Sequence, residues 1–131
     1  MSIPQSHIDL LERASYWHVA TIGPKGEPQS SPVWAGMDDG GHVVISMLAK
    51  RQKVKNLRAN PAVALSAIDP DNAYRYLELR GTVVAIDDEP DHELIDAMAK
   101  KYMGVDDYPF RKPGDERVTI RIAVDRANTM G

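Results

Sequence analysis

Residues 42–61 read HVVISMLAKRQKVKNLRANP, and this stretch determines how the rest of the chain is arranged. Its first part, His42 to Leu48, is apolar and rich in β-branched residues, which is typical of a buried strand. No glycine or proline separates this run from Lys50–Ala59, which favours a helix. The sequence therefore predicts a strand that passes directly into a short helix, which ends at Asn60-Pro61 because proline cannot continue it.

The beginning of that predicted helix is strongly basic. It carries Lys50, Arg51, Lys53 and Lys55, with Arg58 one turn later, and residues 40–68 contain no Asp or Glu. A helix N-terminus already bears the positive end of the helix dipole and unpaired N–H groups, so clustered cations there repel one another unless an anion lies among them. We therefore predict a bound phosphate or another polyanionic group at this position.

The charge of the remaining chain distinguishes a small anion from a nucleic acid. The whole chain has a formal net charge of −3, and residues 40–68 contribute five basic side chains, so the remainder carries −8. A local positive site in an acidic protein attracts small anions, whereas the phosphates of a long nucleic acid would meet acidic surroundings. We expect no nucleic-acid partner. A solvated basic helix face that only aids solubility is the alternative that the charge pattern leaves open.

Length and composition exclude several kinds of chemistry. The chain has 131 residues, which fits one domain over residues 1–131, and it contains no cysteine. Disulfides, thiolate nucleophiles and iron–sulfur clusters are thereby excluded, so redox chemistry would require a bound organic cofactor. The first residues lack a signal-peptide pattern, and no apolar run reaches the ~20 residues that span a bilayer. We expect a cytoplasmic protein without a membrane partner.

The pattern along the chain predicts a mainly β fold, a small antiparallel barrel or sandwich with short helices. Trp17–Ile22 and Pro28–Trp34 flank turn residues and form a predicted hairpin, whose second arm should be an edge strand because it contains Pro28 and Pro32. Further strands are expected at Ala62–Ile68, Tyr74–Asp87 with a bend at Gly81, and Arg117–Val124. Helices are expected at Pro4–Ala14 and from the acidic cluster that begins at Asp87 to about Met103, and residues 125–131 are expected to form a tail.

Motifs for metal or nucleophilic chemistry do not occur. The four histidines, His7, His18, His42 and His92, are widely separated and lack ligand spacing, so we expect no metal site. No nucleophile elbow, P-loop or dinucleotide fingerprint is present, so phosphate binding must come from side chains. The aromatic residues Trp34, Tyr74 and Tyr76 either stack on a planar ring or pack in the core or an interface.

Taken together, the segments WHVATI, PQSSPVW and HVVISMLAKRQKVKNLRANP resemble the split β-barrel proteins related to pyridoxamine 5′-phosphate oxidase, which bind flavins or deazaflavins. The chain is most similar to the branch that uses the 8-hydroxy-5-deazaflavin coenzyme F-420. In that branch a basic segment R-x-K-x-[RK]-N-L is followed by Asn or Asp and then Pro. Here this segment is RQKVKNL, from Arg51 to Leu57, followed by Asn60-Pro61.

The resemblance implies a six-stranded antiparallel split β-barrel of the FMN-binding type, and a homodimer with cofactor sites between the subunits. It also implies a set of cofactor-binding residues. These are Arg51 and Lys53 with Lys55 or Asn56 on the phosphate, Ser30, Ser31, Pro32, Val33 and Trp34 beside the ring, and Tyr74, Arg75 and Tyr76 from the adjoining loop or the partner chain. Lys50 departs from the family, where glycine is common at this position, and either changes the loop or adds a cation for the cofactor tail.

The first functional hypothesis is an F-420-dependent oxidoreductase that transfers hydride between the cofactor and a small electron-poor organic substrate. The catalytic residues are not identified, and Tyr74, Tyr76 or solvent are the candidates for a proton donor. The alternatives are an FMN-binding oxidoreductase of the same fold and a non-enzymatic module that binds the cofactor or haem. Members of the family that make pyridoxal phosphate have a longer basic C-terminal segment, so vitamin B6 oxidation is not expected.

Overall fold

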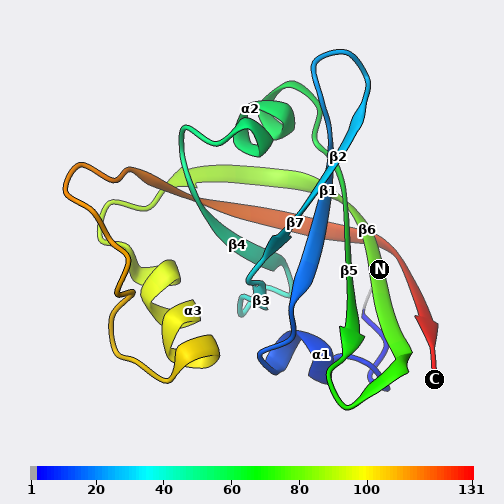
Figure 1. Ribbon diagram of the computed structural model, residues 1–131. Helices are drawn as coiled ribbons and strands as arrows, with labels where there is room; N and C mark the ends of the chain where they lie inside the picture. Colours follow the sequence, from blue (N-terminus) through cyan, green and yellow to red (C-terminus); the bar gives the residue numbers. More distant parts are fainter. Residues whose placement is uncertain (1–2) are drawn as a thin grey trace.

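The computed structural model describes residues 3–131, which form one seven-stranded antiparallel sheet decorated by short helices (Figure 1). The strand order is β2-β1-β5-β6-β7-β4-β3. The elements in chain order are α1 (Asp9–Glu12), β1 (Trp17–Ile22), β2 (Pro28–Val33), β3 (Gly36–Met37), β4 (Val43–Leu48), α2 (Gln52–Ala59), β5 (Ala62–Asp69), β6 (Asn72–Asp88), α3 (Glu93–Met103) and β7 (Arg117–Met130). The predicted mainly β architecture is confirmed, and the two-residue β3 makes the number of strands seven rather than six.

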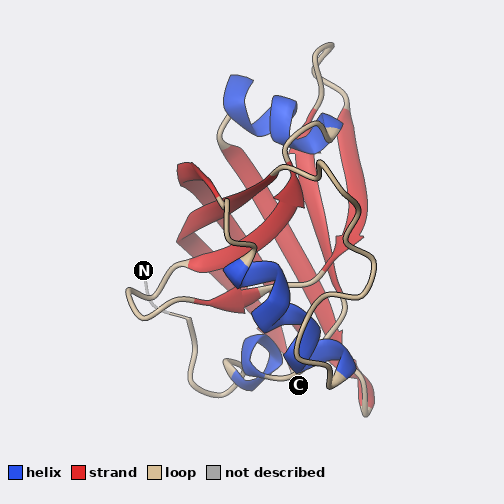
Figure 2. Ribbon diagram, turned by 90° about the vertical axis from the view of Figure 1, so that its left-hand side faces the viewer, coloured by secondary structure: helices blue, strands red, loops and turns tan. Residues whose placement is uncertain are grey.

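The core lies inside the curve of this sheet. Strands such as β5 alternate buried and exposed side chains, as a strand with one covered face requires. Trp17, Leu65, Leu77 and Ile120 are at most 1% exposed. Figure 2 shows the helices at the margins of the curved sheet, with α2 at one end and α1 and α3 at the other. The sheet therefore holds the fold together, and α2 and α3 cover its openings.

The two longest strands, β6 and β7, form the centre of the sheet and bend at Gly81. Their register shifts between Arg80 and Gly81 and again between Val83 and Ala85. A Cβ atom at Gly81 would overlap the carbonyl oxygen of Ala123 on β7, so only glycine allows the strands to approach this closely. This confirms the bend that the sequence predicts at Gly81.

Two predicted boundaries were wrong, and β6 and β7 explain both. Residues 125–130 are not a tail, because β7 continues to Met130 and pairs with β6 as far as Tyr76. The acidic residues Asp87 and Asp88 do not begin a helix, because they pair with β7 as the end of β6. The helix α3 begins only at Glu93, after His92 in the left-handed conformation. Backbone pairing over long distances in sequence outweighs local preference in both places.

The N-terminal segment is also less helical than its sequence predicts. Only Asp9–Glu12 is α-helical, and turns connected by bonds such as the one from the His7 N–H to the Pro4 carbonyl (3.0 Å) precede it. Leu10 and Leu11 nevertheless pack into the core, as expected for a segment that covers the sheet. Across residues 3–131, every helix falls short of the length and apolarity that a membrane crossing requires.

Candidate functional site

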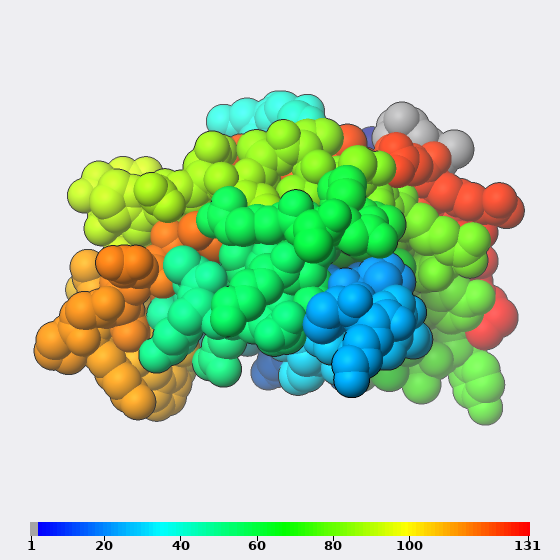
Figure 3. Space-filling model, turned by 90° about the horizontal axis from the view of Figure 1, so that it is seen from above, coloured from blue at the N-terminus to red at the C-terminus, as the bar shows by residue number. Residues whose placement is uncertain are grey.

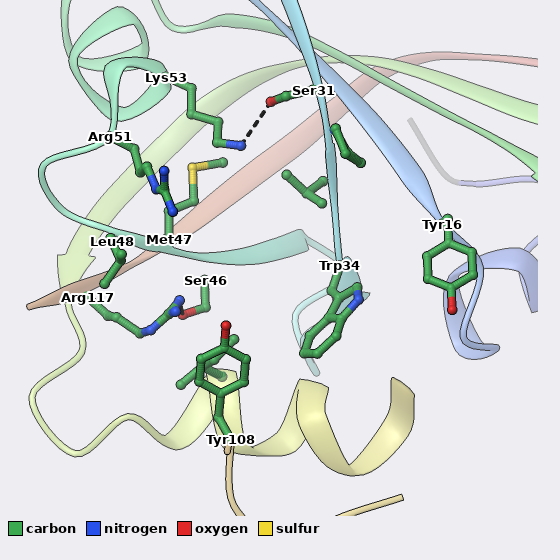
Figure 4. A pocket seen from close by; sticks show the side chains of 13 residues that line it. Tyr16, Ser31, Trp34, Ser46, Met47, Leu48, Arg51, Lys53, Tyr108 and Arg117 are labelled. Atoms are coloured by element: carbon green, nitrogen blue, oxygen red, sulfur yellow. Dashed lines mark hydrogen bonds between the residues drawn. The ribbon is translucent and has the colours of Figure 1, made fainter. Parts of the chain in front are cut away.

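A cavity of about 500 Å³ lies between β2, β4 and the beginning of α2, and the loop after α3 closes one side of it (Figure 4). Its floor comes from β4 and its opposite wall from β2, two strands at different ends of the sheet order. The residues that line it are Tyr16, Ser31, Pro32, Val33, Trp34, Ser46, Met47, Leu48, Arg51, Lys53, Ile95, Tyr108 and Arg117. Its volume is within the range of sites for small ligands.

The beginning of α2 supplies two of the cations in this cavity. Arg51 is the N-cap residue of the helix in an extended conformation, and no side chain caps this end. Lys53, the second residue of the helix, reaches across to β2 and donates a hydrogen bond from Nζ to Ser31 Oγ at 2.9 Å. The unfilled helix N-terminus and the two cations favour an anion at the same point.

Burial and a like charge act on Lys53. Its side chain is half-buried, and burial together with the positive charge of Arg51 lowers the pKa of the ammonium group below its ordinary value. Both effects disfavour the charged form of the side chain. A bound anion would relieve them, because it supplies the opposite charge that the cavity lacks.

The cavity contains no compensating acidic group. None of its lining residues is Asp or Glu, although Arg51, Lys53 and Arg117 are all present. Within residues 3–131, the ion pairs closer than 4.0 Å involve none of these three side chains. Three unpaired cations in one cavity are a strong electrostatic signal for an anionic ligand.

The orientation of α2 is fixed by Asn56, which is 3% exposed. Its side-chain amide donates to Thr21 Oγ1 on β1 and to Gln29 Oε1 on β2, each at 2.9 Å, and its oxygen accepts from Gln52 Nε2. Figure 3 shows the resulting arrangement from above, with α2 in green beside the β1–β2 turn in blue. Asn56 therefore holds the cationic end of α2 against the hairpin that forms the opposite wall.

The aromatic side of the cavity is anchored by Tyr102 of α3. The ring of Trp34 stacks on it with centroids 5.0 Å apart and an interplanar angle of 13°. The Tyr102 hydroxyl donates to the Ser15 carbonyl and accepts from the Ala35 N–H, and Lys101 Nζ donates to the Leu11 and Ala35 carbonyls at 2.7 Å. Trp34 is thus a fixed planar surface in the cavity wall.

The edge strand β2 offers backbone groups to a ligand. It pairs with β1 on one side, and none of the strands in residues 3–131 pairs with it on the other. An unpaired strand edge presents N–H and C=O groups in a regular row. The predicted edge position of Pro28–Trp34 is confirmed for Pro28–Val33, and this edge can hold the polar rim of a planar ligand.

The structure brings together six of the residues that the sequence predicts as cofactor-binding, and it places four basic or polar ones elsewhere. The six in the cavity lining are Ser31, Pro32, Val33, Trp34, Arg51 and Lys53. Lys50 lies instead beside a smaller cavity with Asp115 and Glu116. Ser30 and Lys55 are exposed outside the lining, and Asn56 is buried behind it.

Tyr74, Arg75 and Tyr76 lie away from this cavity within one chain. The Arg75 guanidinium is bound by Asp9 at 2.6 Å and by Asp69 at 2.9 Å, and these carboxylates raise its pKa above the ordinary value. Tyr74 is 79% exposed. Tyr76 lies in a separate groove with Tyr16 and Ile68. Their predicted approach to the ligand from a partner chain stays a prediction.

Sequence reasoning missed seven lining residues, among them Arg117 and Tyr108. Arg117 begins β7 and lies opposite Leu48 in the β4–β7 register. Tyr108 belongs to a polar loop without a regular pattern. Correct pairing of Arg117–Val124 with the strand at 43–48 would have pointed to Arg117, whereas no local signal identifies Tyr108. The other missed residues are Tyr16, Ser46, Met47, Leu48 and Ile95.

Comparison with known families gives a match that spans the described chain. The family model for pyridoxamine 5′-phosphate oxidase matches residues 3–131. The chain belongs to the pyridoxamine 5′-phosphate oxidase family. The resemblance that the basic segment and its flanking strands indicate is therefore confirmed. The cavity of about 500 Å³ described above, called the β2–α2 cavity below, is the candidate ligand site of this family member.

Several solved structures are similar to this chain. An F420 reductase is 39% identical, with 96% of this chain and 98% of that chain covered and a TM-score of 0.85. A conserved hypothetical protein of Mycobacterium tuberculosis, Rv2991, is 25% identical over 99% of this chain and 86% of its own, with a TM-score of 0.77. HupZ of Group A Streptococcus, 23% identical over 97% and 93% with a TM-score of 0.70, shows the shared fold alone. No curated protein sequence matches the chain.

Proposed function

We propose that this protein is an oxidoreductase that uses the deazaflavin coenzyme F-420 and reduces a small electron-poor organic substrate. The observation that carries the proposal is the pair Arg51 and Lys53, which meet at the uncapped end of α2 without a carboxylate partner. The similarity to an F420 reductase supports the choice of cofactor. FMN, which has a single phosphate, is the alternative cofactor for the same cations.

The residues of the cavity fit such a group. Arg51 and Lys53 would hold its phosphate through charge-assisted hydrogen bonds, with Ser31 beside them through its bond to Lys53. The free edge of β2 would offer backbone groups to the polar rim of the ring, and Trp34 supplies a planar surface next to that edge. Lys55 lies outside this lining, so we assign it no direct contact from its own chain.

When bound, the reduced deazaflavin supplies a hydride, two electrons and a proton, to an electron-poor carbon, and a second proton from an acid or solvent completes the reduction. The chain itself contributes binding and orientation. Met47, Leu48 and Ile95 form an apolar floor that excludes water, which strengthens the electrostatic attraction of the cations for an anion. A site of this kind needs neither a thiolate nor a metal among the chain's own residues.

A homodimer is part of the proposal. The cavity is open on one side, and Tyr76 lies with the exposed side chain of Ile68 in a second groove, which shares Tyr16 with the cavity; Tyr74 is exposed as well. A second copy that covers this groove would bring polar and aromatic groups to the open side of its neighbour's cavity. Sedimentation or light scattering at micromolar concentration tests this assembly, and a monomer would contradict it.

The decisive test of the site is the double variant Arg51→Ala/Lys53→Ala, titrated with oxidised F-420 by fluorescence. We expect the loss of at least about 2 kcal/mol of binding free energy, or a Kd about 30-fold higher, because two charge-assisted contacts disappear. The matched control is Lys55→Ala/Arg58→Ala, which removes the same charge from exposed positions on the same helix. Its Kd should stay within about threefold of the wild-type value.

Two results would change the conclusion. An unchanged Kd in Arg51→Ala/Lys53→Ala would remove the phosphate assignment. Parallel titration with FMN separates the cofactors: tighter binding of FMN than of F-420 would keep the site and replace the proposed reaction class.

A further inference from the structure

Arg117 is a third cation of the β2–α2 cavity, and the proposed phosphate contact does not use it. It is the first residue of β7, lies opposite Leu48 on β4 and is half-buried. Among the described residues, no carboxylate lies within 4.0 Å of its guanidinium. A half-buried guanidinium without an acidic partner has unused capacity for an oxyanion, because it carries five N–H donors.

Two contacts hold this guanidinium in place. It lies over the ring of Tyr108, 5.0 Å from the ring centroid, and Nη1 donates to Ser46 Oγ at 3.3 Å. The remaining donors are free to bind a ligand. Because its position is fixed before any ligand arrives, little side-chain entropy would be lost on binding.

Tyr108 joins Arg117 to the aromatic wall. Its backbone N–H donates to Asp96 Oδ1 at 2.9 Å, and its ring meets Trp34 edge-on, with centroids 6.0 Å apart at 88°. Figure 4 shows the Arg117 side chain turned toward Ser46 and Tyr108, whereas Lys53 turns toward Ser31. The cavity thus has two cationic positions on different elements, and only that of Arg117 adjoins a flat aromatic surface.

We propose that Arg117 is a specificity-determining residue that binds the carboxylate of a planar, conjugated substrate, a proposal that rests on the reductase function above. Tyr108 would contact the flat conjugated part, which leaves the free face of Trp34 to the cofactor ring, and the planar guanidinium would pair with the two carboxylate oxygens. Arg51 and Lys53 remain the site of the cofactor phosphate. A carboxylate could also come from the anionic tail of the cofactor, and the experiment separates these two sources.

The experiment compares cinnamate, a planar conjugated carboxylate, with cinnamamide, its neutral analogue, by calorimetric titration of protein saturated with oxidised F-420. Wild-type protein should bind cinnamate at least tenfold more tightly than cinnamamide. Arg117→Met should remove this preference, and Arg117→Lys should retain part of it. Arg121→Met is the matched control on the same strand and should leave the preference intact, because Arg121 pairs with Asp38 and Asp87 outside this cavity.

The cofactor titration is repeated on the Arg117 variants. A Kd for F-420 within threefold of the wild-type value, together with the loss of cinnamate preference, supports the substrate role. A tenfold weaker F-420 complex with unchanged cinnamate binding would assign Arg117 to the cofactor tail and overturn the proposal. Equal binding of cinnamate and cinnamamide, or no binding of cinnamate at millimolar concentration, would also overturn it. Neither result would affect the separate test of Arg51 and Lys53, so the two proposals fail independently.

Discussion

Two cavities of similar size in this protein have opposite charge. The β2–α2 cavity, about 500 Å³, is lined by three cations and no carboxylate. A second cavity of about 560 Å³ lies between the beginning of α3, the end of β6 and the first residues of β7. It is lined by one arginine, Arg121, and by the carboxylates Asp38, Asp87, Asp88, Glu89, Asp91 and Glu93. The two cavities also differ in whether their charged side chains have partners within the chain.

Key carboxylates of the acidic cavity already have partners within the chain. Asp38 accepts from the N–H groups of Gly40 and His42 at 2.9 Å and pairs with Arg121 at 3.3 Å. Glu89, 6% exposed, accepts from the Ile95 N–H at 3.0 Å and from Thr119 Oγ1 at 2.9 Å. The cations of the other cavity, by contrast, have no carboxylate within 4.0 Å among the described residues. This lack of an internal acidic partner is the reason to propose the β2–α2 cavity as the binding site.

The largest expected effect tests the structural role of the acidic cavity. Glu89→Ala leaves the Ile95 N–H and the Thr119 hydroxyl without partners in a buried position and removes the cap of α3. We expect a loss of about 2–3 kcal/mol in the free energy of unfolding, measured with urea, and an F-420 Kd within threefold of wild type. Glu93→Ala, an exposed position in the same turn, is the control, with a change below about 0.5 kcal/mol. A loss below about 1 kcal/mol for Glu89→Ala would contradict the structural role that we assign to the acidic cavity.

An intermediate effect concerns pH and the ligand-binding cavity. Burial, with Arg51, lowers the pKa of Lys53, so this lysine loses its proton at a lower pH than a free lysine. F-420 binding should therefore weaken as pH rises through that lowered pKa, by up to about tenfold if one charge-assisted contact is lost. Lys53→Arg stays protonated and should show a flatter dependence, and the ratio of the two Kd values cancels the titration of the ligand itself. Parallel curves for the two proteins would argue against contact between Lys53 and the anion.

The smallest effect is the stability cost of an unpaired cation. Lys53→Met removes a half-buried charge but keeps the length of the side chain, so the protein without cofactor should become more stable, by no more than about 1 kcal/mol. Burial lowers the pKa of Lys53 in the folded protein, which means that the protonated form disfavours folding at neutral pH. Thermal unfolding at pH 7 provides the measurement, with Lys55→Met at an exposed position as the control. A clear destabilisation would show that the bond from Lys53 to Ser31 outweighs the cost of the charge.

The sequence predicts the local part of this architecture well. The strand at 43–48, the helix after it and the edge position of Pro28–Val33 each follow from residue type and order, and all are confirmed. The pair Arg51 and Lys53 could be predicted as an anion site because a helix N-terminus with clustered cations has a direct electrostatic meaning. The resemblance to a known family added an expectation about the cofactor class and a predicted role for residues 30–34 beside its ring, and that role stays a prediction.

Contacts between distant segments could not be predicted from local patterns. Arg117 and Ser46 meet although they are 71 residues apart, because β7 pairs with β4. Residues 125–130 are polar enough to resemble a tail, yet their backbone groups pair with β6. The ion pairs of Arg75 illustrate the same limit, since the carboxylates of Asp9 and Asp69 that hold it lie on other segments.

The buried amide of Asn56 joins the first turns of α2 to the β1–β2 hairpin through hydrogen bonds, so that the two elements move together. The cations on α2 and the backbone edge of β2 cannot shift independently, since the bonds to Thr21 and Gln29 would have to break first. Bonds within the chain therefore hold the two walls that a ligand would touch at a set separation. Local opening that frees one wall must expose the other as well, so the site should open and close as a single cooperative element rather than by fluctuation of separate loops.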